Sequence, residues 1–292
     1  MTEIKYGNNV FYKYRPINKY TDSLLINNEL YFNYPDNFND PFDCKLDCYH
    51  KGTLNEWITF FTQRGIHPVE AHNTIREYLK EGIMKQKNDG ILLDNTKKNN
   101  LALYKDVNGI LDIGNKLRPC CFSELRNDIL MWSRYAQEHT GICLIFKSVD
   151  YGDHCVLPLN SPHYLPFFEV NYTENKPKKV NLMDMSDKEE IIRLMEFMRT
   201  KSKKWEYEKE RRLLATIYDR EGKETINFQK DALAGIIFGL KIEPDAARHI
   251  KELVDEYYKG INVKLYRTYE IRGKYEIDFK EIVDFDKYIR LL

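Results

Sequence analysis

Runs of β-forming residues alternate with segments of helical periodicity along this chain, and this alternation most constrains the fold. Two segments, residues 186–204 and 243–260, have the apolar spacing of amphipathic helices. Five runs rich in aromatic and β-branched residues predict strands: VFYKYRP (10–16), ELYFNYP (29–35), ICLIFKS (142–148), AGIIFGLKI (234–242) and INVKLYRTYEI (261–271). We therefore expect one α+β domain over residues 1–292, with a split or mixed central sheet.

Residues 50–116 differ in character and predict an α-helical insertion within this domain. LNEWITFFTQRG (54–65) and PVEAHNTIREYLKEGIMKQK (68–87) show helical periodicity. The stretch KNDGILLDNTKKNN (87–100) is polar and is expected to be a connector.

Charge and cysteine content exclude several classes of protein. Lys plus Arg and Asp plus Glu both number 45, so net charge provides no long-range attraction to nucleic acid or to a membrane. No apolar run is long enough for a membrane span, and MTEIKYGNN is not a signal peptide, so we expect a cytoplasmic protein without a membrane partner. The six cysteines lack the two tight pairs of a zinc site, and we expect no metal.

The stretch KWEYEKERRLLAT (203–215) is the first candidate site. If a strand runs from about residue 206 to 218, Glu208, Glu210 and Arg212 share one face, because side chains alternate in a strand. Neighbouring carboxylates repel unless a cation compensates, which Arg212 can do. If the preceding helix continues instead, the same glutamates lie on separate faces as ordinary surface charges.

Aromatic and histidine residues of NDILMWSRYAQEHTG (127–141) are a second group of candidates. Trp132 and Tyr135 are spaced i, i+3 on a predicted short helix, where they either pack in the core or form a wall for a ligand. His139 precedes the helix-ending Gly141, so it either contacts the last carbonyls of the helix or takes part in catalysis.

The loop NDPFD offers Asn39, Asp40 and Asp43, which form either an Asx-type turn with Pro41 or a substrate-binding loop.

Three further residues have polar side chains on predicted strands. Lys13 and Arg15 alternate onto one face of VFYKYRP, and Ser123 follows an apolar strand, where it either caps the next turn or belongs to a site.

Three segments carry a family resemblance. YKYR with LYFNYPDNFNDPFD, CFSELRNDILMWSRYAQEHTGICLIF, and WEYEKERRLL resemble, in order and spacing, a widespread bacterial family described as domain of unknown function 2971. The pattern runs through most of the chain, and it implies no particular activity.

The order of strand, short helix with an aromatic residue, strand and E-x-E strand is also similar to that of the ADP-ribosyltransferases. This resemblance implies a matching fold and NAD as the substrate. In that superfamily a first-strand residue, a serine and an aromatic residue hold NAD, and a later glutamate holds the nicotinamide ribose. The matching positions are Lys13 or Arg15 for the first strand, Ser123 with Trp132 and Tyr135 for the middle motif, and Glu208 and Glu210 for the acidic motif.

The resemblance implies an enzyme that cleaves the nicotinamide–ribose bond and transfers ADP-ribose to a macromolecule or to water, as a toxin or a phage-defence effector does. The charge of Glu210 would stabilise the developing oxocarbenium ion, Arg15 would grip the diphosphate, and Tyr135 would face nicotinamide.

Two other classes remain open. One is a nuclease that holds a divalent metal with Asp40, Asp43, Glu208 and Glu210. The other is a non-catalytic sensor that binds a nucleotide in the same cleft.

Overall fold

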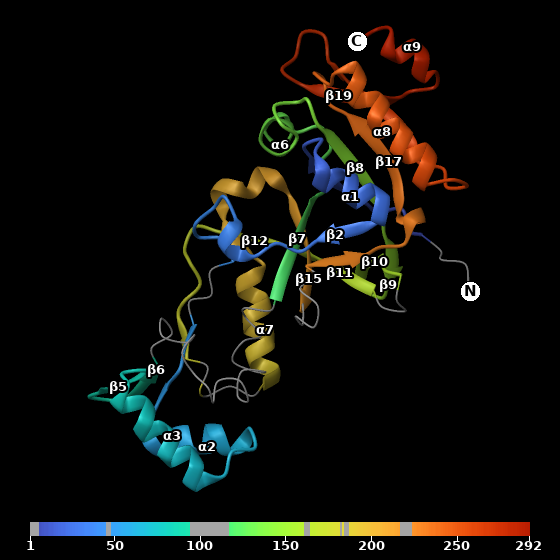
Figure 1. Cartoon of the computed structure of the whole chain (residues 1–292). Coiled ribbons are helices and arrows are strands. Elements are labelled where there is room, and N and C mark those ends of the chain that lie inside the picture. Colours follow the sequence, from blue (N-terminus) through green and yellow to red (C-terminus); the bar gives the residue numbers. More distant parts are fainter. Residues whose placement is uncertain are drawn as a thin grey trace. The chain divides into compact units, whose positions relative to one another are not determined.

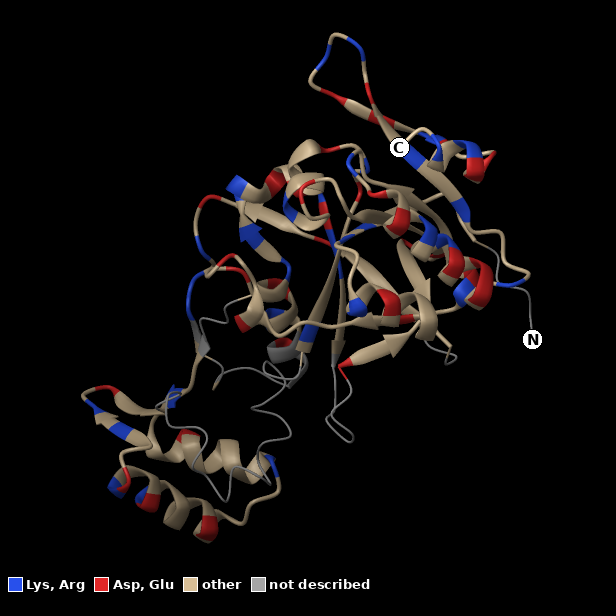
Figure 2. Ribbon diagram, turned by 45° about the horizontal axis from the view of Figure 1, so that its top comes forward, with Lys and Arg blue, Asp and Glu red and all other residues tan. Residues whose placement is uncertain are grey.

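The structure is a computed structural model that describes residues 6–44, 48–93, 117–160, 164–181, 183, 187–216 and 224–292. The chain divides into two compact units. The first comprises residues 1–39, 118–172 and 201–292, and the second comprises residues 40–117 and 173–200. Acidic and basic residues are interspersed along the ribbon (Figure 2), in keeping with a net charge of +0. None of the described helices is both long and apolar enough to cross a membrane.

A ten-stranded sheet forms the centre of the first unit (Figure 1). In the order in which they are hydrogen-bonded, its strands are β19 (Ile277–Glu281), β18 (Lys264–Glu270), β17 (Leu233–Phe238), β8 (Ile142–Lys147), β1 (Val10–Arg15), β7 (Leu117–Ser123), β15 (Glu210–Thr216), β11 (Tyr164–Glu169), β10 (His154–Pro158) and β9 (Val149–Tyr151). Strands β17 and β18 are parallel, whereas β1 is antiparallel to both of its neighbours. This mixed sheet confirms the predicted α+β class.

Helices cover the two faces of the sheet. On one face, which we call the α1 face, α1 (Lys19–Asn27) and α8 (Pro244–Tyr257) pack on the larger core through residues such as Leu25 and Ile250. On the other, the α6 face, Met131 and Trp132 of α6 (Ile129–Tyr135) pack against alternate residues of the same strands. The short helix α9 (Phe285–Ile289) adds Tyr288 to the larger core.

Local signals explain where these helices begin and end. Asn18 and Asp128 cap α1 and α6 by accepting backbone N–H bonds, and Pro244 occupies the first turn of α8. The sequence predicted a helix over 127–141, but α6 stops at Tyr135. Three consecutive residues with positive φ, Gln137, Glu138 and His139, follow it, and such a backbone cannot continue a right-handed helix.

Short strands and turns complete the first unit. They are β2 (Glu29–Tyr31), which pairs with β16 (Thr225–Asn227), and the 3₁₀ turns η1 (Pro35–Asn37), η4 (Lys203–Glu208) and η5 (Lys230–Ala232). A further pair, β12 (Asn171–Thr173) and β14 (Thr200–Ser202), leads from one unit to the other.

The second unit has its own core. Its helices α2 (Leu54–Gln63) and α3 (Pro68–Lys80) pack around the fully buried Trp57, with the three-stranded sheet β4 (Lys51–Gly52), β6 (Gly90–Leu93) and β5 (Met84–Lys87). A parallel pair, β3 (Cys48–Tyr49) and β13 (Val180–Asn181), and helix α7 (Asp187–Met198) also belong to it.

The predicted insertion is therefore helical only in part. Both predicted helices are present, but α3 ends before Gly82, whose φ of 68° closes the helix, and residues 84–87 then form a strand instead of a third helical turn. Residues 90–93, expected in a connector, pair with that strand. Residues 94–116 lie outside the described part of the chain.

Candidate functional site

The candidate acidic stretch is a 3₁₀ turn followed by a strand. Residues 203–208 form η4, Lys209 has a left-handed backbone (φ 41°), and β15 begins only at Glu210. The strand predicted from about residue 206 to 218 is therefore present but begins later, because residues 206–208 belong to the 3₁₀ turn and Lys209 has a left-handed backbone. Residues 217 and 218 lie outside the described part of the chain. Strand alternation relates Glu210 to Arg212, while Glu208 reaches the same place from the preceding turn.

Four charged side chains form a buried group that we call the glutamate cluster: Lys201, Glu208, Glu210 and Arg212. The ammonium Nζ of Lys201 lies 2.6 Å from Glu208 Oε2 and 2.9 Å from Glu210 Oε2. Arg212 donates two bonds to Glu210, from Nε to Oε1 at 2.7 Å and from Nη2 to Oε2 at 2.9 Å. All four residues are buried, and Arg212 is 0% exposed. Two positive and two negative charges thus neutralise each other out of water, which is the condition under which buried charges are tolerated.

Tyr135 connects the glutamate cluster to the surface. Its hydroxyl donates to Glu208 Oε1 at 2.6 Å and accepts a bond of 3.4 Å from Nδ2 of the exposed Asn39. The tyrosine itself is half-buried. A continuous chain of hydrogen bonds therefore leads from Arg212 through the cluster to the edge of the protein.

Backbone contacts hold the two glutamates in place. The Tyr172 hydroxyl accepts the N–H of Glu210 at 2.8 Å. The Ser123 hydroxyl donates to the Glu208 carbonyl at 2.6 Å and accepts the N–H of Leu125 at 3.0 Å. Ser123 is thus a structural link between β7 and η4, in agreement with the interpretation of this residue as a cap.

The two carboxylates differ in pKa. Burial raises the pKa of Glu208 above its usual value, although Lys201 and Tyr135 oppose this. Burial also disfavours the charge of Glu210, but Arg212 and Lys201 together outweigh it and hold the pKa of Glu210 well below its usual range. Their pKa values therefore move in opposite directions from the usual glutamate value.

Cys121 is a further neighbour of the cluster. Its thiol is hydrogen-bonded to Glu210, and burial, followed by the charge of Glu210, raises its pKa. The thiol therefore acts as a neutral donor to the carboxylate.

Aromatic rings border the cluster. Trp205 lies between two cations, with Lys201 Nζ at 5.0 Å and the guanidinium carbon of the exposed Arg134 at 4.6 Å from its ring centroid. Trp132, by contrast, is 0% exposed, packs edge-on against Tyr14 and donates its indole N–H to the Arg126 carbonyl. Of the predicted aromatic pair, Tyr135 is at the site, and Trp132 belongs to the core.

His139 stacks on Trp132 at a ring distance of 6.3 Å. Its Nδ1 is buried without a hydrogen-bond partner in the described residues, and its pKa is lowered, first by burial and then by Lys241. Its carbonyl accepts the N–H of Lys241 at 3.0 Å. These contacts link two loops and involve none of the four cluster residues.

Lys13 and Arg15 lie on the opposite face of the sheet. Tyr12 is paired with Ser123 across β1 and β7, so Tyr12 and Ser123 point to the α6 face, and the residues alternating with Tyr12 point to the α1 face. Accordingly, Lys13 Nζ bonds the Cys121 carbonyl and lies over the Phe122 ring, and Arg15 Nε bonds Thr21 of α1. The expectation that Arg15 converges with the glutamates was wrong, because one strand reveals its alternation but not which face meets which helix.

The NDPFD loop forms the expected turn. The Asp40 carboxylate accepts the N–H of Phe42 at 2.9 Å, which is an Asx turn. Asp40 and Asp43 are both buried and belong to the second unit, whereas Asn39 belongs to the first. The described residues contain no group of three or more His, Cys, Asp or Glu side chains that could hold a metal ion.

Sequence reasoning missed Lys201, Tyr172 and Cys121. Lys201 is one of three lysines in KSKK, and nothing in the sequence distinguishes the buried lysine from its exposed neighbours. Cys121 could have been found from the alternation of LRPCCFS, since it shares a face with Ser123.

Comparison with known families points to the same region. Residues 131–213 match the model of a family described as "Protein of unknown function (DUF2971)", in support of the resemblance seen in the sequence. The matched segment contains Tyr135 and all four residues of the glutamate cluster. Neither the curated proteins nor the solved structures gave a match.

Proposed function

We propose that the protein is an ADP-ribosyltransferase-like enzyme that cleaves the nicotinamide–ribose bond of NAD and transfers ADP-ribose to a macromolecule or to water. The opposite pKa shifts of two adjacent buried glutamates carry this proposal. Cleavage of a glycosidic bond needs a fixed negative charge for the oxocarbenium ion and a second group that takes up a proton. Two carboxylates whose environments separate their pKa values suit these two roles.

Glu210 is assigned the electrostatic role. Because its oxygens are held by Arg212 and Lys201, it stays ionised and stabilises positive charge on the ribose without forming a bond to it. The bonding electron pair of the glycosidic bond leaves with nicotinamide.

Glu208 is assigned the proton transfer. Water or an acceptor hydroxyl attacks the ribose carbon, and its proton passes through the Tyr135 hydroxyl to Glu208. Tyr135 is suited to this relay because burial, followed by the charge of Glu208, raises its pKa and keeps the hydroxyl protonated between transfers.

The diphosphate of NAD needs a cation other than Arg15. The exposed Arg134 stacks on Trp205, whose ring also contacts Lys201, and it presents a guanidinium beside the glutamate cluster. We assign Arg134 to the diphosphate, since a guanidinium matches phosphate oxygens as a fork.

Release of nicotinamide from NAD by the purified protein tests this function. Glu210→Gln keeps the shape and removes the charge, so the rate should fall about 10²-fold or more, while NAD affinity changes much less. Glu206→Gln is the matched control, because Glu206 is half-exposed and pairs with Lys209 at 3.6 Å. The mechanism is abandoned if the wild type releases no nicotinamide with any acceptor or water, or if Glu210→Gln keeps the wild-type rate.

One observation favours a second candidate, a sensor that binds a nucleotide without turnover. Each of the four carboxylate oxygens of Glu208 and Glu210 already accepts a bond from a neighbouring side chain. Tight NAD binding in calorimetry, without nicotinamide release, would establish the sensor instead of the transferase.

A further inference from the structure

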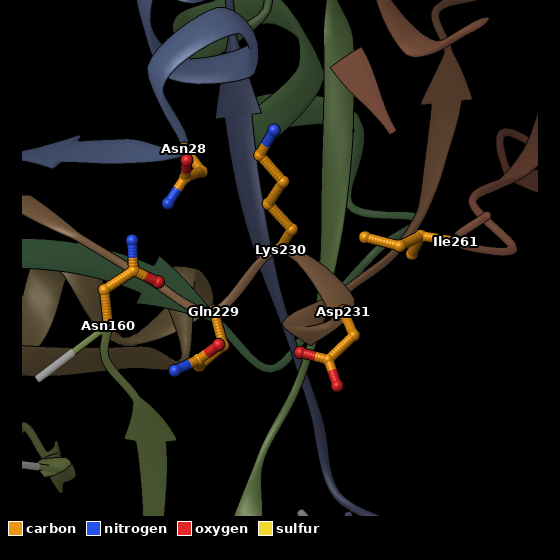
Figure 3. A pocket seen from close by; sticks show the side chains of 6 residues that line it. All are labelled: Asn28, Asn160, Gln229, Lys230, Asp231 and Ile261. Atoms are coloured by element: carbon orange, nitrogen blue, oxygen red, sulfur yellow. The ribbon is translucent and has the colours of Figure 1, made fainter. Parts of the chain in front are cut away.

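A cavity of about 410 Å³ lies in the first unit, apart from the glutamate cluster (Figure 3). Its lining residues come from the end of α1, the end of β10, the turn η5 and the segment after α8: Asn28, Asn160, Gln229, Lys230, Asp231 and Ile261. Ile261 packs on the larger core, which marks the α1 face of the sheet. The size is typical of a small-molecule site.

The polar side chains of this cavity are held in place by bonds to the surrounding protein. Asn28 Nδ2 donates to the Phe228 carbonyl at 2.6 Å, and Gln229 Nε2 donates to the Leu159 carbonyl at 2.9 Å. Because these bonds fix the side chains before a ligand arrives, binding would cost little conformational entropy.

The charged side chains are fixed in the same way. Lys230 Nζ donates to the Tyr257 carbonyl at 2.9 Å, and Asp231 Oδ1 accepts from the Tyr6 hydroxyl at 2.7 Å. Lys230 retains further N–H donors, since an ammonium group carries three.

These bonds leave hydrogen-bond acceptors available in the cavity. Both amide side chains use their nitrogens, so Asn28 Oδ1 and Gln229 Oε1 accept no bond from the described residues, and neither does Asp231 Oδ2. Three amide side chains gather at one side of the cavity in Figure 3, and Ile261 points in from the other side. A ligand must therefore supply mainly donors, together with an apolar edge for Ile261.

Charge narrows the class of ligand. Lys230 and Asp231 contribute one charge of each sign, so the cavity is neutral as a whole. A phosphate or carboxylate would be repelled by Asp231 and by the acceptor oxygens. A cation would be repelled by the Lys230 ammonium. Hydroxyl groups both donate and accept, so a molecule that carries several of them can bond both to these acceptors and to the Lys230 ammonium.

We propose that this cavity binds an uncharged molecule with neighbouring hydroxyl groups, such as a monosaccharide or the ribose of a nucleoside. Asp231 and the amide oxygens of Asn28 and Gln229 accept its hydroxyl protons, Lys230 donates to its oxygens, and Ile261 covers its C–H edge. The site is independent of the proposed NAD chemistry, because it lies on the other face of the sheet.

Saturation-transfer NMR and calorimetry on the full chain test this proposal, with D-ribose, methyl glucoside and inositol as probes. Asp231→Asn should weaken binding about tenfold, since a charged acceptor makes the stronger hydrogen bond. Tyr6→Phe is the comparison variant: it removes the bond that orients Asp231 but keeps the carboxylate, so it should weaken binding clearly less than Asp231→Asn does.

Charged analogues of the probes distinguish a site for uncharged molecules from a site for phosphate or for a cation. Ribose phosphate and glucosamine should bind more weakly than their uncharged counterparts. The proposal is overturned if no uncharged probe binds, if ribose phosphate binds best and Lys230→Met abolishes that binding, or if Asp231→Asn binds as well as the wild type. An equal loss of binding in Asp231→Asn and Tyr6→Phe would also overturn it, because the carboxylate itself would then add nothing to the affinity. Nicotinamide release from NAD is unaffected by Asp231→Asn, so failure here is distinct from failure of the transferase.

Discussion

Strand β15 and its neighbour β7 place opposite chemistry on the two faces of one sheet. On the α1 face they bury Phe122 and Leu213 in the larger hydrophobic core, where Lys13 reaches the Phe122 ring. On the α6 face, one residue away along each strand, they bury Ser123, Glu210 and Arg212. The backbone is shared, so the difference lies in the side chains alone.

This difference is the reason for proposing the functional site on the α6 face. Apolar burial contributes about 25 cal/mol per Å² without requiring exact geometry. Buried ion pairs often add no net stability compared with hydrophobic residues of the same size. Stability alone therefore does not explain the burial of two glutamates, a lysine and an arginine on one face, and we propose the candidate site there for this reason.

The largest expected effect comes from removing the cation between the two glutamates. Lys201→Met should lower the free energy of unfolding by about 3–5 kcal/mol, because it leaves an uncompensated charge in a buried site. Urea unfolding followed by tryptophan fluorescence measures this. Lys204→Met is the matched control, since Lys204 is exposed in the same run of lysines, and it should be neutral. Equal stability of the two variants would mean that Lys201 does not hold the carboxylates together.

Removing a buried apolar side chain on the α1 face should lower the free energy of unfolding somewhat less, and the loss should not depend on pH. Leu213→Ala removes a fully buried side chain and is expected to cost about 3 kcal/mol at every pH. The cost of Lys201→Met should shrink in acid, because protonation of Glu208 removes one of the two repelling charges. If the stability losses of the two variants depended on pH in the same way, the proposed difference between the charged and the apolar face would be wrong.

The two glutamates should show opposite pH signatures. The folded-state pKa of Glu208 is raised, so its contribution to stability is full below the ordinary glutamate pKa and is lost as pH rises through the raised value. The pKa of Glu210 is depressed, so its contribution is present above the ordinary value and is lost as pH falls through the depressed value.

Relative to the wild type, Glu208→Gln should therefore gain stability as pH rises above the ordinary glutamate pKa. Glu210→Gln should lose relative stability as pH rises from the depressed value to that ordinary value. Each difference amounts to about 1.4 kcal/mol per unit of pKa shift. Chemical denaturation across acidic and neutral pH measures both, and slopes of the same sign would refute the assignment of the two roles.

The smallest effect is expected on the α1 face. Arg15→Met keeps most of the stem and removes the bond to Thr21, so it should cost about 0.5–1.5 kcal/mol. Nicotinamide release should stay at the wild-type rate, in contrast to Glu210→Gln. A strong loss of activity in the Arg15 variant would show that Arg15 takes part in the reaction after all.

Much of the fold could be predicted because its signals are local. The strands β1, β8, β17 and β18 show continuous runs of β-formers, and α8 shows a clear apolar stripe. β5 was mistaken for helix, since MKQK carries no strand signal of its own and depends on pairing with β6. β19 was not predicted because IDFKE is charged and short, and it becomes a strand through its pairing with β18.

The candidate site could be predicted where the residues lie close in sequence. Glu208, Glu210 and Arg212 are within five positions, and both the predicted strand and the observed turn followed by a strand bring them together. Lys201 could not be selected, because only the tertiary structure distinguishes it from other lysines. Arg15 was misplaced for a different reason: whether it faces α1 or α6 depends on how distant elements pack on the sheet.

The position of β1 in the sheet has a consequence for the nascent chain. Its two neighbours, β7 and β8, lie at residues 117–123 and 142–147, so this aromatic strand leaves the ribosome long before either partner exists. An unpaired strand of this composition is prone to aggregate, and charged residues within it oppose that. Lys13 and Arg15 interrupt VFYKYR at alternate positions, so we expect them to oppose aggregation of the emerging strand before the sheet forms.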